Sequence, residues 1–211
     1  GEIPEGWEVK ELPEVCDIVD CLHSKKPEYL PSSEKFLLQV CNIGDFHTLE
    51  LSEKYFVSDE DYQEWTRNVE VNEGDCIITN AGLTGAIAQI PYGFFGGIGR
   101  NLTCIRPIKI TPTYLLQFLV SSVGKKQILK NIDEGTIFSS LNVKGIRKIM
   151  ILVPERRVMK KYEINTRALR YKIEVNVNEK AVLSNIRDLI LPKLMSGKIR
   201  VPISENASGS P

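Results

Sequence analysis

The sequence lacks any apolar run that approaches the roughly 20 residues needed to cross a membrane. Its first residues, Gly1–Pro4, do not show the basic and then apolar pattern of a secretion signal. Positive charge is not in excess, because Lys and Arg number 27 and so do Asp and Glu. Proteins that bind nucleic acid indiscriminately usually carry a basic excess. We therefore expect a cytoplasmic protein without a membrane segment, in which any contact with nucleic acid depends on a local surface.

The sequence also lacks the short motifs of common catalytic sites. The glycine-rich stretch Gly93–Gly99 has neither phosphate-binding-loop spacing nor a dinucleotide fingerprint with a downstream acid, so tight turns explain it better. There are only two histidines and no nucleophile elbow around a serine. The acids of Asp59–Asp61 suit the first turn of a helix. We expect no catalytic residue in this chain.

Cysteine is scarce, and its spacing predicts no metal site. The common zinc patterns require close pairs of ligands, and the cysteines and histidines of the first 50 residues are not spaced in that way. Most of the cysteines lie among apolar neighbours, which indicates buried, reduced thiols. The residues concerned are Cys16, Cys21, Cys41, Cys76 and Cys104, together with His23 and His47.

One long stretch, from about Pro154 to Gly197, has no interior glycine and a single interior proline, Pro192. A proline and an acid at its start and a glycine at its end are helix start and stop signals. Apolar residues recur every seven positions and form a narrow stripe on a helix of roughly 60 Å, at about 1.5 Å per residue. A helix of this length needs a partner helix, so we expect a coiled coil. The expected interface is Tyr162, Leu169, Ile173, Asn176, Leu183, Ile186 and Ile190.

Two residues of this stretch have special roles in the expected helix. Asn176 falls on the apolar seam, where a polar residue can fix the register of a coiled coil. Pro192 removes the hydrogen bond to the carbonyl of Asp188, so we expect the regular helix to bend or end there. The segment from Lys193 to Ile199 would then form a separate turn.

Residues 1–153 differ in composition from the helix and predict an α/β (α+β) domain of short, mixed strands. Apolar runs bounded by glycine and proline indicate strands, and residues 100–107 alternate as a strand with one exposed face would. Residues 113–130 predict one amphipathic helix. We expect a domain at 1–153, the long helix at 154–200 and a flexible tail at 201–211.

Loops rich in small and amide residues separate these strands and form the candidate binding surface. Amide, hydroxyl and basic side chains are the groups that read base edges and hold phosphates. Taken alone, each loop is better explained as a plain connection, and a solvated face explains the basic residues as well as a binding role does. Those residues are Lys144, Arg147, Lys148, Arg156 and Arg157. The candidate DNA-binding residues are Asn80, Thr84, Arg100, Asn101, Ser139, Ser140, Asn142 and Lys144.

Four motifs together carry a resemblance to a known family. They are Ile3-Pro4-Glu5-Gly6-Trp7, Gly74-Asp75-Cys76-Ile77-Ile78 with Gly82 and Gly85, Gly135-Thr136 followed by Leu141 and Leu152-Val153-Pro154, and the segment from Ile186 to Ile199. In this order and spacing they resemble the specificity subunits of type I restriction-modification systems. The resemblance covers nearly the whole chain, and its last motif is the most specific.

The resemblance implies a DNA target-recognition domain followed by a long conserved helix, an arrangement that the family repeats twice in one chain. Each recognition domain would read one half of a two-part double-stranded DNA target, and antiparallel helices would fix the distance between the half-sites. Methylation and cleavage would belong to separate methyltransferase and restriction subunits, with S-adenosylmethionine on the methylating one. This chain has one domain and one helix, so it is either a half-length subunit that forms a homodimer through the helix or one half of a longer subunit.

Two readings from other classes stay open at this point. The chain could be a fragment of a DNA methyltransferase or nuclease whose catalytic part has no recognisable signature. It could also be a protein-interaction adaptor in which the coiled-coil helix is the working part and the domain is a passive head.

Overall fold

The computed structural model of the chain describes residues 3–22, 27–134 and 139–200. It divides into two compact units, Gly1–Glu174 and Val175–Pro211, each of which is considered by itself. The domain boundary expected at residue 153 falls inside the first unit, because the first half of the C-terminal helix packs on the domain. The expected flexible tail, residues 201–211, lies outside the described residues.

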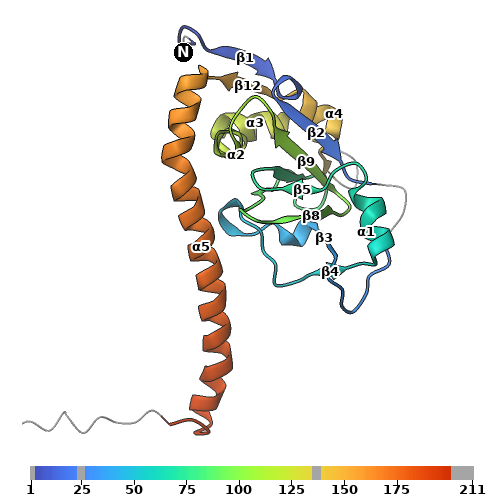
Figure 1. The fold of residues 1–211 in the computed structure, drawn as a ribbon, viewed down its shortest axis with the longest axis vertical. Helices are drawn as coiled ribbons and strands as arrows, with labels where there is room; N and C mark the ends of the chain where they lie inside the picture. The colour runs from blue at the N-terminus through green and yellow to red at the C-terminus, as the bar shows by residue number, and fades with distance from the viewer. Residues whose placement is uncertain (1–2, 23–26, 135–138, 201–211) are drawn as a thin grey trace, which may run out of the picture. The chain divides into compact units, whose positions relative to one another are not determined.

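The first unit is built from short strands and short helices, as the sequence predicts (Figure 1). The strands are β1 (Glu8–Glu11), β2 (Cys16–Asp20), β3 (Phe36–Leu38), β4 (Tyr55–Phe56), β5 (Val71–Asn72), β6 (Cys76–Thr79), β7 (Ile87–Gln89), β8 (Phe95–Ile98), β9 (Leu102–Pro107), β10 (Asp133–Glu134), β11 (Ser139–Ser140) and β12 (Met150–Val153). The helices are α1 (Asp59–Thr66), α2 (Pro112–Val120), α3 (Ser122–Lys130), α4 (Val143–Arg147) and α5 (Arg156–Met195), with 3-10 turns η1 (Leu12–Glu14), η2 (Val40–Asn42) and η3 (Asp45–His47).

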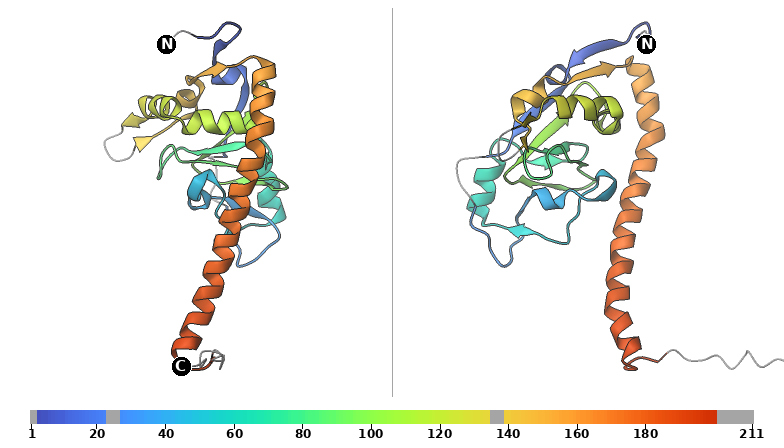
Figure 2. Two further views of the ribbon diagram at one scale, coloured as in Figure 1. Left: turned by 90° about the vertical axis from the view of Figure 1, so that its left-hand side faces the viewer. Right: turned by 180° about the vertical axis from the view of Figure 1, so that it is seen from behind.

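An antiparallel sheet in the order β2-β9-β6-β7 lies at the centre of the unit. Successive side chains of a strand point to opposite faces, so each strand can feed two cores. Cys76 and Ile78 of β6 enter one core, and Ile77 between them enters the other. The core on one face contains side chains of α2, α3, α4 and β12, and the core on the other contains those of α1, β3 and β8. The ribbons of these elements lie on the two sides of the sheet in Figure 2.

This arrangement corrects two expectations from the sequence. Strand β9 has no exposed face over Leu102–Ile105, because it pairs with β2 on one side and β6 on the other and has a core on each face. The single helix expected at 113–130 is broken into α2 and α3 at Ser121, whose extended backbone has φ of −65° and ψ of 163°. The Ser121 hydroxyl oxygen accepts the N–H of Gly124 at 3.1 Å and so caps α3.

The turn before β6 explains one of the four sequence motifs. Gly74 has φ of +87°, and a Cβ there would lie 2.8 Å from the Pro112 ring, so a larger residue would strain this turn. The carboxylate of Asp75, which is 1% exposed, accepts the Asn72 N–H at 3.0 Å and the Arg106 guanidinium at 2.6 to 3.1 Å. A buried carboxylate needs such partners, and here they fix the turn to β9.

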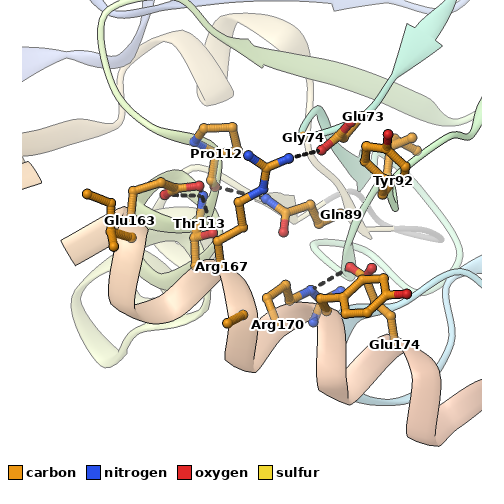
Figure 3. A pocket seen from close by; sticks show the side chains of 14 residues that line it. Glu73, Gly74, Gln89, Tyr92, Pro112, Thr113, Glu163, Arg167, Arg170 and Glu174 are labelled. Atoms are coloured by element: carbon orange, nitrogen blue, oxygen red, sulfur yellow. Dashed lines mark hydrogen bonds and ion pairs between the residues drawn. The ribbon is translucent and has the colours of Figure 1, made fainter. Parts of the chain in front are cut away.

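Polar side chains on the first half of α5 hold it against the domain (Figure 3). The Glu163 carboxylate accepts the backbone N–H and the hydroxyl of Thr113, each at 3.1 Å, and so caps the first turn of α2 in place of Thr111. Arg170 is 7% exposed and donates to the carbonyls of Phe46 at 2.7 Å and His47 at 2.5 Å. We call these contacts the α5 seam.

Arg170 stabilises an unusual turn. Phe46 and His47 have φ values of 54° and 61°, a left-handed conformation that costs about 1–2 kcal/mol for each residue with a side chain. In that conformation both carbonyls point to the guanidinium, whose Nε donates to Glu174 at 3.1 Å. Burial lowers the pKa of Arg170 from its ordinary value, and the Glu174 carboxylate opposes that shift.

The rest of α5 presents apolar side chains to solvent. None of residues 175–200 is buried, and Leu183, Ile186 and Ile190 are 57%, 44% and 40% exposed. The helix continues through Pro192 to Met195, so it does not end at the proline, and Lys193–Met195 are helical rather than a separate turn. A proline in the last turn removes one hydrogen bond close to an end that would fray in any case. The helix ends at Met195, and Gly197, two residues later, has φ of +70°, as is usual just after a helix end.

The cysteines are all free thiols, and four of them are buried. Cys41 is exposed, contrary to the expectation from its apolar neighbours. Burial raises the pKa of the Cys16 thiol to about 12. Within 3–22, 27–134 and 139–200 no group of three or more His, Cys, Asp or Glu could hold a metal, and His23 lies outside those ranges. No helix of the described chain is long and apolar enough to cross a membrane.

We predict that Arg170→Met lowers the free energy of unfolding by about 2–4 kcal/mol, because it leaves two strained carbonyls and a half-buried carboxylate without their cation. The matched control is Arg167→Met, the same change one turn earlier, where the guanidinium is exposed and makes a single ion pair of 2.8 Å with Glu73. An exposed pair contributes less than about 1 kcal/mol. Urea unfolding of both variants measures the difference, and equal midpoints would contradict a stabilising role for Arg170.

Candidate nucleic-acid interface

Three loops that are far apart in the sequence meet at one end of the central sheet. They are residues 80–85 after β6, residues 99–101 before β9 and residues 139–144, which include β11 and the start of α4. The Asn80 N–H donates to the carbonyl of Asn101, and the Leu141 N–H donates to the carbonyl of Asn80, both at 2.8 Å. We call the surface formed by these three loops the loop face.

Side chains add to these backbone contacts. The Asn80 amide donates to the Leu141 carbonyl at 2.8 Å, and the Thr84 hydroxyl donates to the Ser139 carbonyl at 3.1 Å. Ser139 is exposed and Ser140 is half-buried. Ser140 pairs with Asp133 across the ladder between β10 and β11. The loops at 80–85 and 139–141 therefore form one surface, although about 55 positions separate them in the chain.

Asn142 has a structural contact for each end of its amide group. Its oxygen accepts the N–H of Gly145 at 2.8 Å and caps α4, and its nitrogen donates to the Asp133 carboxylate at 2.5 Å. Lys144, on the first turn of α4, is exposed. A cation with an exposed side chain at this position is well placed to contact phosphate.

The loop at 99–101 contributes an exposed cation and an unusual backbone. Asn101 has φ of 64°, a left-handed conformation that asparagine tolerates better than most residues. Its carbonyl can then accept from Asn80 while its side chain stays exposed. Arg100 is exposed and lies near Tyr29, where its charge partly offsets the rise that burial causes in the tyrosine pKa.

The structure thus brings the eight candidate residues to a single region. Whether they touch DNA stays a prediction. The basic residues from α4 to α5 behave differently, because α4 and the start of α5 lie at opposite ends of β12 (Figure 1). Lys144, Arg147 and Lys148 therefore form a patch separate from Arg156 and Arg157. The motif residues Gly135 and Thr136 lie outside the described residues.

Sequence reasoning missed the residue that supports the loop face from beneath. Thr103 of β9 is fully buried, and its hydroxyl lies 3.0 Å from Oδ1 of Asn80 and 3.1 Å from Oδ1 of Asp20. A hydroxyl residue between two apolar neighbours, Leu102 and Cys104, is the signal that could have identified it. The face as a whole offers amide, hydroxyl and basic groups, which suit hydrogen bonding to a polar ligand.

Comparison with known proteins assigns the chain to a family. A family model described as type I restriction modification DNA specificity domain matches residues 4–158, well over half of the chain. The chain belongs to this family. The match includes the whole loop face, so this face is part of the family's DNA specificity domain.

Two relatives come from Methanocaldococcus jannaschii. The MjaVIII specificity subunit of a type I restriction enzyme is 27% identical over 95% of this chain and 48% of its own length. The MjaIX specificity subunit is 24% identical over 95% of this chain and 46% of its own length. The chain spans about half the length of the curated relatives it matches.

Solved structures of the same kind of subunit share the fold. The HsdS subunit from Thermoanaerobacter tengcongensis gives a TM-score of 0.54 at 18% identity, covering 94% of this chain and 47% of that one. The S subunit of a type I restriction-modification system from M. genitalium gives 0.61 at 11% identity, covering 93% and 48%. These similarities confirm the expected fold class, a mixed α/β domain followed by a long helix.

We predict that Asn142→Ala lowers the free energy of unfolding by about 1 kcal/mol, the usual effect of losing a helix N-cap. It should also reduce the protection of the Gly145 amide from hydrogen exchange, because that amide then keeps only its bond of 3.0 Å to the backbone carbonyl of residue 142. Asn142→Asp is the matched variant, because it keeps the capping oxygen and loses only the amide nitrogen that contacts Asp133. Protection of Gly145 should therefore survive in Asn142→Asp. Loss of protection in both variants would show that the cap is not what orders α4.

Proposed function

We propose that this chain is a DNA-recognition subunit without catalytic residues of its own, which reads one half of a two-part double-stranded DNA sequence. The observation that carries the proposal is the convergence of the three loops of the loop face within a DNA specificity domain. Amide and hydroxyl groups on such a face match the donors and acceptors of base edges, and Arg100 and Lys144 match guanine or phosphate.

The neutral net charge of the chain favours a complex in which a partner subunit supplies part of the affinity for DNA. Phosphate neutralisation supplies most non-specific affinity, and a chain without a basic excess has little of it. We therefore expect modest DNA affinity for the isolated chain and tighter binding with a methyltransferase subunit, which would hold S-adenosylmethionine. A restriction subunit would complete the assembly.

We predict that Arg100→Ala or Lys144→Ala weakens binding to the preferred DNA by about 1–3 kcal/mol at matched salt if the residue contacts a base. If Lys144 contacts a phosphate instead, the loss of affinity should be similar for all DNA sequences. The number of ions released on binding, read from the salt dependence of the affinity, should then fall by about one. The preferred sequence would come from selection among random duplexes with the methylating subunit present. Lys109→Ala is the control, since this exposed lysine follows the opposite end of β9.

Two outcomes would contradict the proposal. Selection that yields no sequence preference would favour the adaptor, in which the domain is a passive head. Binding of S-adenosylmethionine by the isolated chain, measured by calorimetry, would favour the enzyme fragment. Unchanged affinity for Arg100→Ala or Lys144→Ala would remove only that residue from the interface.

We also propose that two copies of the chain pair through α5 and so restore two recognition domains. The support is the exposed apolar stripe of the helix, in which Leu169, Leu183 and Ile190 are 63%, 57% and 40% exposed. Such a stripe is unfavourable in water and suits a second helix. If the chain is one half of a longer subunit, the second helix of that subunit would fill the same place.

We predict that the chain sediments as a dimer at micromolar concentration. Leu183→Glu should raise the dimer dissociation constant at least about tenfold, because it places a charge in the apolar stripe between the two helices. The control is Asn178→Glu, which lies about 140° around the helix from Leu183 at about 100° per residue. A strict monomer of the unmodified chain at micromolar concentration would refute pairing through α5.

A further inference from the structure

Asn80 is the residue at which all three loops of the loop face meet. Its backbone N–H binds the Asn101 carbonyl, and its backbone carbonyl binds the Leu141 N–H. Its side chain adds a bond from Nδ2 to the Leu141 carbonyl at 2.8 Å and a bond from the Thr103 hydroxyl to Oδ1 at 3.0 Å. Leu141 is itself fully buried, so this tie anchors the 139–144 loop in the core.

The chemistry of these partners fixes how the Asn80 amide group is turned. A backbone carbonyl can only accept, so the nitrogen of the amide group must face Leu141 and the oxygen must face Thr103. The single hydroxyl proton of Thr103 is shared between two acceptors, Oδ1 of Asn80 at 3.0 Å and Oδ1 of Asp20 at 3.1 Å. Asparagine is the shortest side chain that offers a donor and an acceptor on two separate atoms.

Thr103 makes the arrangement testable because it cannot touch a ligand. It is fully buried in the central strand β9, with β2 on one side and β6 on the other. The Thr103 hydroxyl therefore lies between Asp20 at the end of β2 and Asn80, whose amide nitrogen binds the 139–144 loop.

We propose that Asn80 is a positioning residue for sequence recognition. Through Leu141 and Thr103 it sets the spacing of the three loops, and the base edges are read by exposed groups of those loops. This inference rests on the proposed DNA-binding function, and it changes the part expected of Asn80 from direct contact to support.

The tie can be measured without DNA, by hydrogen exchange of backbone amides in the full chain. Asn80→Asp replaces the donor by an oxygen that faces the Leu141 carbonyl, so the two acceptors repel. The Leu141 amide should then exchange at least about tenfold faster while amides of the central sheet stay protected, because only the local opening free energy changes. Asn68→Asp, the same change at an exposed position after α1, should leave Leu141 unaffected. Unchanged exchange of Leu141 in Asn80→Asp would overturn the proposal.

Specificity distinguishes positioning from direct contact. Thr103→Val keeps the buried shape and removes the hydroxyl, whereas Thr103→Ser keeps the hydroxyl. With the methylating subunit present, the ratio of affinities for the preferred and a mismatched duplex should fall on the order of tenfold in Thr103→Val, about the discrimination of one base pair. It should stay within about twofold in Thr103→Ser. The salt dependence should not change, because no phosphate contact is lost.

The outcomes separate this inference from the proposed function. Loss of specificity in Asn80→Ala with full specificity in Thr103→Val would mean that Asn80 contacts DNA directly, and the proposal would fail. Absence of any sequence preference in the unmodified protein would defeat the proposed function, and the exchange experiment alone would then decide whether Asn80 ties the loops. Urea unfolding of each variant shows whether it is folded under the conditions of both measurements.

Discussion

The burial of both faces of the sheet β2-β9-β6-β7 is the constraint on which the rest of the domain depends. Because the strands feed a core on each side, the sheet has no free face to offer a ligand. Functional groups can then lie only where strands end, and the loops after β6 and before β9 end side by side because these two strands are neighbours. The position of the loop face follows from this topology, and its exposed side chains can vary without disturbing the cores.

The contacts of the α5 seam hold one side of the helix on the domain and leave another side available to a partner. The side of the helix that faces the domain carries Glu163 and Arg170, whose charges are satisfied by α2 and by the turn at Phe46 and His47. Polar contacts of this kind are directional, so they fix the helix at one register, which apolar packing alone does less strictly. The apolar stripe is consequently left exposed, and its exposure is what makes a second helix the natural partner in the proposed function.

The sequence predicted the features that depend on local pattern. The helix expected between Pro154 and Gly197 is α5 at Arg156–Met195, because a long heptad pattern without glycine needs no tertiary information. The sequence could not show that β9 is buried on both faces or that Ser121 breaks a helix, since neighbouring elements decide both. It also missed the burial of Arg170, because an arginine in a charged helix looks like every other exposed cation until its partners from another part of the chain are known.

The loop face shows why residue type alone overestimates direct contact. Asparagine was a good candidate at positions 80 and 142 because it reads adenine well, yet the same donor and acceptor pair makes it a good structural tie and a good helix cap. In this structure the side chains of Asn80 and Asn142 are engaged within the protein, whereas Arg100, Ser139 and Lys144 are exposed. A face that must present few groups at fixed distances needs such internal ties, because a contact misplaced by even one ångström loses most of its selectivity. Recognition by this domain therefore depends as much on the residues that hold its loops as on those that reach outward.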